Sequence, residues 1–168
     1  MTVAESTKTL SEKELGLLLQ YTVEAYKTFE KLAENLPNPM SAQMFKEFAV
    51  DERLTRDLLD MKIEAAGANR IRTTLAGDLQ FQSILEGDLS FRETTEFLIN
   101  RERTMEKTLV DWSRNASATD RNLLIYVAAG KRAHIVELER ELELIKLDRD
   151  WFKREDADWR IVHGSRQE

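Results

Sequence analysis

The chain has 168 residues and a mass of 19.5 kDa, which is enough for one domain with a single buried core and too short to favour two. Its residues are 42% hydrophobic and 33% charged, with only 6 Gly and 2 Pro, a composition typical of a mostly helical soluble protein. The formal net charge of -6 argues against binding of nucleic acid or an anionic membrane, because both are bound through clustered Lys and Arg.

Cysteine is absent from the sequence, which excludes a disulfide, a thiolate nucleophile and a Cys-ligated metal. Residues 1–10 lack the apolar core of a secretory signal, and no stretch approaches the length of a membrane span. We therefore expect a flexible N-terminus over residues 1–10, no membrane segment, and a cytoplasmic location.

The first predicted helix spans residues 12–35. Ser11 and Glu14 have the spacing of a capping box, in which each side chain accepts a hydrogen bond from an otherwise unpaired amide. The prolines at positions 37 and 39 end the helix, since proline cannot continue it. Thr22 is the polar interruption in an apolar stripe made of Leu15, Leu18, Leu19, Thr22, Ala25, Tyr26, Phe29, Leu32 and Ala33.

The second predicted helix spans residues 41–66, with its cap supplied either by Asn38 and Pro39 or by Ser41. Gly67 follows, as suits the left-handed position after a helix. Its stripe contains Met44, Phe45, Phe48, Glu52, Thr55, Leu58, Leu59 and Lys62. Glu52 occupies a position where a leucine would be expected.

Residues 68–89 form the longest connection, and the apolar segment 79–85 within it predicts a short crossover helix. Ser90 and Glu93 repeat the capping-box spacing and begin a third helix over 91–115. Residues 115–120 end this helix and cap the next. The third stripe contains Phe91, Thr94, Leu98, Glu102, Met105, Leu109 and Trp112, so a second carboxylate lies among core positions.

The fourth predicted helix spans residues 121–148 and carries two ionisable residues on its apolar face. Val127, Lys131, His134 and Leu138 follow one another in steps of four, three and four, which places them on one stripe. Buried charge needs a partner, so we expect Lys131 and His134 to meet Glu52 and Glu102.

The C-terminal tail, residues 149–168, contains large aromatic side chains. We expect Trp151, Phe152 and Trp159 to dock on the bundle or on a second subunit, because leaving them in water would forfeit the free energy of burial.

The chain also contains an internal repeat. A shift of 79 positions superposes the first capping box on the second, Glu52 on Lys131 and Thr55 on His134, and a shift of 80 superposes Thr22 on Glu102. The chain is therefore predicted to be two copies of an antiparallel helix pair. Four helices with one long connection form the ferritin-like arrangement.

Residues 24–33, followed by residues 48–55, resemble the helix pairs of rubrerythrin-like proteins of the ferritin-like superfamily. The resemblance covers roughly residues 11–148 and implies an all-α, antiparallel four-helix bundle of ferritin-like type with a long crossover between helices two and three. In that family each pair supplies one Glu from its first helix and a Glu-x-x-His from its second, and the six side chains hold two irons. The corresponding residues here are Thr22, Glu52, Thr55, Glu102, Lys131 and His134.

Glu24 is an alternative ligand on the first helix if the alignment is displaced by two residues. That position lies about 200° around the helical wheel from Thr22, so its carboxylate is expected to point to solvent.

This set of residues predicts loss of the di-iron site. Two carboxylates and one imidazole are too few to hold two metals, and the ammonium of Lys131 has no lone pair to donate. Our interpretation is that Lys131 takes over the electrostatic role of the metals in a hydrogen-bonded core without a cofactor. Alternatively, Lys131 extends its ammonium to the surface, and His134 is a core imidazole with a satisfied hydrogen bond.

Two functions remain from the sequence. The first is a metal-free structural or interaction module that forms a homo-oligomer, most simply a dimer. The alternative is a rubrerythrin-like metalloprotein, an oxidoreductase that handles iron or peroxide, with one iron or manganese held by Glu52, Glu102 and His134.

Overall fold

The structure, a computed structural model, describes residues 9–65 and 89–154. In these residues the chain forms four long helices, α1 (Glu12–Asn35), α2 (Pro39–Ala65), α4 (Phe91–Ser113) and α5 (Ala118–Leu147), and a short 3-10 helix, η2 (Trp151–Lys153). Each predicted end of a long helix lies within three residues of the observed one. The crossover predicted over residues 68–89 and its short helix at 79–85 fall outside the described residues, apart from the last residue of the range.

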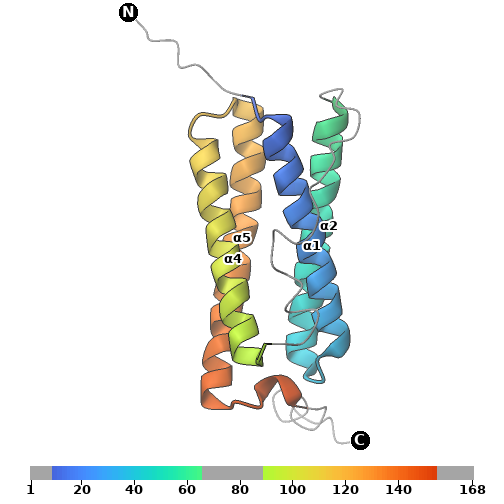
Figure 1. Ribbon diagram of the computed structural model, residues 1–168, viewed down its shortest axis with the longest axis vertical. Helices are drawn as coiled ribbons and strands as arrows, with labels where there is room; N and C mark the ends of the chain where they lie inside the picture. The colour runs from blue at the N-terminus through green and yellow to red at the C-terminus, as the bar shows by residue number, and fades with distance from the viewer. Residues whose placement is uncertain (1–8, 66–88, 155–168) are drawn as a thin grey trace, which may run out of the picture.

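The long helices pack as two antiparallel hairpins, α1 with α2 and α4 with α5, and α2 also contacts α5 (Figure 1). The end of α2 and the start of α4 lie at opposite ends of the bundle, so these two helices run in the same direction. The described part of the chain is therefore an all-α bundle built from two helix pairs.

Polar side chains cap each helix where the sequence predicts a start. Ser11 Oγ accepts from the amide of Glu14 at 3.1 Å while the Glu14 carboxylate accepts from the Ser11 amide, and Ser90 and Glu93 do the same on α4. Of the two predicted caps for α2, Asn38 is the one used, since its Oδ1 accepts from the amides at positions 40 and 41.

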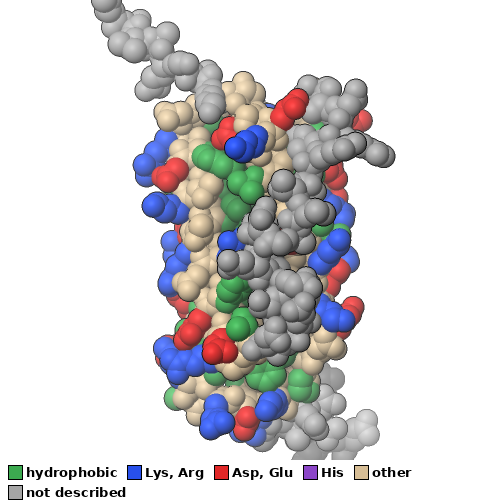
Figure 2. Space-filling view, in the orientation of Figure 1, with side chains coloured by type: hydrophobic (Ala, Val, Ile, Leu, Met, Phe, Trp, Pro, Cys, Tyr) green, Lys and Arg blue, Asp and Glu red, His purple; other side chains and the backbone are tan. Residues whose placement is uncertain are grey.

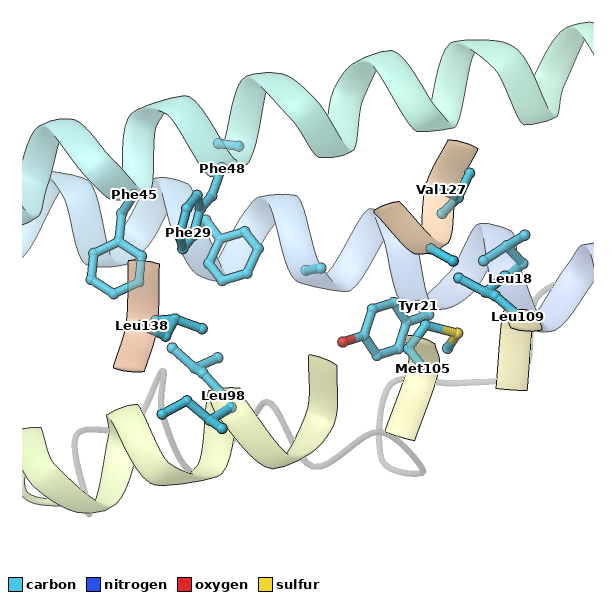
Figure 3. Packing of buried hydrophobic residues seen from close by; sticks show 14 of the residues in the cluster. Leu18, Tyr21, Phe29, Phe45, Phe48, Leu98, Met105, Leu109, Val127 and Leu138 are labelled. Carbon is cyan, nitrogen blue, oxygen red and sulfur yellow. The ribbon is translucent and has the colours of Figure 1, made fainter. Parts of the chain in front are cut away.

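The core divides into two apolar layers along the bundle. Figure 3 shows Phe29, Phe45, Phe48, Leu98 and Leu138 in one group and Leu18, Tyr21, Met105, Leu109 and Val127 in the other. On every helix except α1, an ionisable residue lies between the two groups: Glu52 follows Phe48, Glu102 follows Leu98, and Lys131 follows Val127. The helices thus place charge at one level, between two apolar layers.

The C-terminal end of the described chain closes one end of the bundle. Phe152 is 1% exposed, and its ring lies against those of Phe45 and Phe91, with centroids 6.2 and 5.2 Å away. The indole of Trp151 donates to Glu141 Oε2 at 2.8 Å, and Ser41 Oγ donates to the same oxygen at 2.8 Å. The expected docking of Trp159 falls outside the described residues.

A buried carboxylate on α5 is held by an ion pair at the other end of the bundle. Lys62 of α2 contacts Asp120 Oδ1 on α5, and the amide of Leu10 donates to Asp120 Oδ2 at 2.9 Å. This carboxylate therefore joins α2, α5 and the residue that precedes the first capping box.

Acidic and basic side chains are interspersed along both edges of the face drawn in Figure 2, with an apolar strip between them. None of the helices in residues 9–65 and 89–154 contains an apolar stretch long enough to cross a membrane.

Candidate functional site

Four ionisable side chains meet in the layer between the two apolar groups. Glu52 comes from α2, Glu102 from α4, and Lys131 and His134 from α5, and each is no more than 2% exposed. The ammonium of Lys131 forms an ion pair with Glu52 Oε1, and its Nζ lies 3.4 Å from Glu102 Oε2. Lys131 therefore stays in the core and does not extend to the surface. We call these four residues the charge cluster.

His134 links the charge cluster to the surface of α2. Its Nδ1 lies 3.2 Å from Glu102 Oε1, and its Nε2 lies 3.0 Å from Oδ2 of Asp51, whose side chain is 61% exposed. The ring stacks on Phe48, with centroids 4.1 Å apart and planes inclined by 27°. Since each nitrogen faces a carboxylate oxygen, the arrangement suits an imidazolium that donates from both.

Tyr21 of α1 covers the cluster from the remaining helix. Its hydroxyl donates to Glu102 Oε2 at 3.3 Å, and Lys131 Nζ lies 4.9 Å from the centroid of its ring. Figure 3 shows this hydroxyl pointing from its apolar layer towards the gap between the layers. Burial and the Glu102 carboxylate raise the pKa of Tyr21 well above its usual value, so the phenol stays neutral and donates.

The pKa values follow from how completely each charge is paired. Burial alone would lower the pKa of His134, but the hydrogen bonds with Asp51 and Glu102 outweigh burial and raise it to about 9. Burial would likewise lower the pKa of Lys131, and the charges of Glu102 and Glu52 reverse this and raise it. At pH 7 both basic groups of the cluster are therefore protonated.

The two carboxylates differ. Burial would raise the pKa of Glu102, but Lys131 and His134 outweigh it and lower the pKa. For Glu52 burial prevails, and the pKa is raised. The contacts explain the contrast, because both oxygens of Glu102 have partners whereas Oε2 of Glu52 is buried without a hydrogen-bond partner among the residues that the structure describes.

The remaining predicted ligand positions, Thr22 and Thr55, are buried but have other surroundings. Thr22 donates its hydroxyl to the carbonyl of Leu18, one turn earlier on α1, at 2.8 Å. Thr55 lines a cavity beside the charge cluster. Glu24, the alternative ligand, is half-buried, and its carboxylate accepts a hydrogen bond from Gln20. The prediction that this carboxylate points to solvent is therefore wrong.

Two residues of the site were not predicted. Tyr21 precedes Thr22 by one position and reaches the cluster because its side chain is long. Asp51 precedes Glu52, and its position on the helical wheel predicts a surface residue, which agrees with its largely exposed side chain. Because the ring nitrogens of a buried histidine often contact carboxylates, His134 indicates that such a partner exists, but the sequence does not show that the partner is Asp51.

Glu52, Glu102 and His134 are nevertheless a possible set of metal ligands, because one donor atom from each lies within 4.8 Å of the other two. These atoms are already in use: Lys131 contacts both carboxylates, and His134 faces a carboxylate on each side. A pair of metals does not fit this donor set, since the ammonium lies between the carboxylates that would have to bridge them.

Comparison of the chain with protein-family models, with curated proteins and with solved structures finds no match.

Proposed function

We propose that the protein is a ferritin-like bundle of rubrerythrin-like ancestry in which the charge cluster replaces two metals. Two helix hairpins with equivalent capping boxes support this relationship, and so does the meeting of Glu52, Glu102, Lys131 and His134 at one level. The single observation that carries the proposal is the contact of Lys131 with both buried carboxylates. One fixed ammonium then supplies the positive charge that metal ions would supply.

The function that fits such a core is that of a structural or interaction module. A core held by side-chain charges keeps its shape without a cofactor, and Phe48 and Tyr21 pack directly against it. The outer faces of α2 and α5 support an interaction role, since they expose large apolar side chains, namely Val50, Leu54, Met61, Ile125, Tyr126 and Val136. We propose that these faces take part in a homo-oligomer, most simply a dimer.

Metal analysis tests the proposal. The full-length protein, purified from cells supplied with Fe(II) or Mn(II), is expected to contain less than stoichiometric iron, manganese and zinc. Light scattering on the same sample gives the number of subunits. One equivalent of tightly bound metal per chain would overturn the metal-free reading, and a monomer at micromolar concentration would overturn the oligomer.

The second candidate is a reduced metalloprotein, an oxidoreductase acting on iron or peroxide. The proximity of donor atoms from Glu52, Glu102 and His134 favours it. Those residues would hold a single iron or manganese, which would supply redox chemistry, and Lys131 would have to leave its present position. Calorimetry with Fe(II) or Mn(II) separates the two functions, because a metal can bind here only by displacing the ammonium and releasing a proton from His134.

A further inference from the structure

A cavity of about 470 Å³ lies at the end of the bundle that η2 closes, where the start of α4 lies beside the end of α5 (Figure 1). Its volume is within the range of roughly 300–1,000 Å³ that is usual for small-molecule sites. Four basic side chains line it: Arg92 from α4, Lys146 from α5, and Arg149 and Lys153 from the residues that follow α5. Basic groups from separate segments of the chain therefore surround one space.

The same cavity has an apolar wall made of Phe91, Ile145 and Leu89. Ile145 is buried, and the ring of Phe91 lies against that of Phe152, with centroids 5.2 Å apart, so helix packing fixes this wall. Lys153 Nζ lies 6.0 Å from the centroid of the Phe91 ring, which brings a basic group and the apolar wall together. A ligand that fits this cavity therefore has an anionic group beside an apolar body.

Two of the four basic groups have carboxylate partners, and these partners lie outside the cavity. Arg92 pairs with Glu96 and Lys146 pairs with Glu143, and both carboxylates line a different groove between α4 and α5. All four side chains are exposed, and an ion pair of this kind contributes at most about 1 kcal/mol. Arg92 and Lys146 can therefore turn to a ligand at small cost.

The other charges around the cavity leave an excess of positive charge along its wall. Asp150 is the acidic residue in the wall, and its Oδ1 lies 3.8 Å from Lys153 Nζ, beyond hydrogen-bond distance. Arg149 forms no ion pair with the residues that the structure describes. Glu93 and Asp148 are outside the wall, since Glu93 caps α4 and Asp148 has its own ion pair. The positive end of the α4 dipole and the negative end of the α5 dipole meet here and offset each other.

We propose that this cavity binds a small, soluble organic phosphate monoester, whose phosphate accepts hydrogen bonds from the four basic side chains and whose organic part packs against Phe91 and Ile145. Near pH 7 a phosphate monoester has a charge of roughly −1.5 to −2 and three acceptor oxygens. A guanidinium donates to a phosphate through two parallel hydrogen bonds, and two guanidinium groups line this cavity. A carboxylate has one charge and two oxygens, so it satisfies fewer of the basic groups.

The residues that line this cavity are separate from the charge cluster, so binding here is independent of the proposed function.

Four probes test the chemistry on the full-length protein: phenyl phosphate, phenol, inorganic phosphate and benzoate. Binding at low salt is followed by NMR through the backbone amides of Ser90 and Arg149, which line the cavity. Phenyl phosphate is expected to bind about tenfold or more tightly than phenol, because hydrogen bonds to charged groups contribute that much. It is also expected to bind more tightly than inorganic phosphate, which has no ring to bury, and than benzoate, which has fewer acceptors. Equal or tighter binding of any of the other three probes would overturn the proposal.

Two glutamine variants locate the site. Arg149→Gln removes the basic group that has no ion pair in the described part of the chain, and it is expected to weaken phenyl phosphate binding about tenfold. Arg114→Gln makes the same change of charge at the far end of α4, outside the cavity, and is expected to bind like the parent. Circular dichroism on both variants establishes that helix content matches the parent. Retained affinity in Arg149→Gln, or an equal loss in Arg114→Gln, would show that the probe binds elsewhere and would overturn the assignment.

A phosphate monoester is also the headgroup of phosphatidic acid, so a second experiment separates a soluble ligand from a membrane. The full-length protein is sedimented with phosphatidylcholine vesicles that contain or lack phosphatidic acid. It is expected to stay in solution with both, because the formal net charge of -6 opposes binding to an anionic membrane. Sedimentation with the phosphatidic acid vesicles would assign the basic groups to a lipid surface and would overturn the proposal of a soluble ligand.

Discussion

Nε2 of His134 lies 3.0 Å from Oδ2 of Asp51. The His134 side chain is 3% exposed and the Asp51 side chain is 61% exposed, so this contact connects the core to the surface. The second nitrogen of His134 faces Glu102, so the imidazolium is held at both ends. Protonation of this single group is therefore coupled to the integrity of the bundle.

Stability is expected to fall as the pH rises through the pKa of His134. The folded pKa of about 9 exceeds the usual value of 6.5, so the stabilisation is fully present below about pH 6.5 and is lost progressively up to and through pH 9. The total is roughly 3 kcal/mol in the free energy of unfolding. Urea unfolding between pH 6 and 10 measures it. The only other histidine, His163, offers a matched control, since His163→Gln should leave the pH dependence unchanged and His134→Gln should remove it.

Replacing Lys131 with Met should destabilise the protein strongly. The ammonium compensates two buried carboxylates, and removing one member of a buried charge cluster costs about 3–5 kcal/mol. Urea unfolding at pH 7 gives the difference. Arg103→Met is the control, because it breaks an exposed ion pair with Glu139 and should cost less than about 1 kcal/mol. Comparable stabilities for Lys131→Met and the parent would contradict the compensating role.

A triple variant, Thr22→Glu with Thr55→His and Lys131→Glu, should acquire metal. It supplies the six ligand types of the rubrerythrin-like pattern and removes the ammonium from between the carboxylates. Metal analysis after exposure to Fe(II) should find bound iron in the triple variant and none in the parent. The double variant that keeps Lys131 is expected to stay metal-free, and iron in that protein would show that the ammonium is no obstacle.

Deletion of residues 150–168 should lower the Tm or dissociate an oligomer. It removes Phe152 from between Phe45 and Phe91, and it removes the indole donor to Glu141. Calorimetry and light scattering measure the two effects. Truncation after Arg154 keeps Trp151 and Phe152 and is the matched control for the remainder of the tail, including Trp159. A full deletion that melts like the parent would show that these contacts contribute nothing.

Helical periodicity and capping spacing were sufficient to predict the four long helices, because both depend on local sequence, and the internal repeat predicted their pairing into two hairpins. The same periodicity identified Glu52, Glu102, Lys131 and His134 as core residues from four-residue and three-residue steps alone. It could not identify Tyr21 or Asp51. A helical wheel gives the direction of a Cβ, whereas these two residues reach the site through the length and bending of their side chains.

The same limit explains the error at Glu24 and the buried carboxylate of Glu141. Glu24 lies off the core stripe, yet it is half-buried, and Gln20, one turn away, donates to it. Glu141 is 3% exposed, and its carboxylate accepts from Ser41, which lies 100 residues away in the sequence, and from Trp151 beyond the end of the same helix. Burial of these carboxylates depends on which other parts of the structure pack beside them, and the sequence of a single helix does not predict those neighbours.

Glu52 and Lys131 are 79 residues apart, which is the period of the repeat, so each is the counterpart of the other in the two helix pairs. If two copies of the first pair assembled in the same way, Glu52 would face Glu52 with no cation between them. Two copies of the second pair would place Lys131 against Lys131, each still beside its own Glu102. Like charges buried face to face repel strongly, whereas the mixed assembly joins opposite charges. The two halves of the chain are thus complementary and not interchangeable, and as separate fragments they would select each other over themselves.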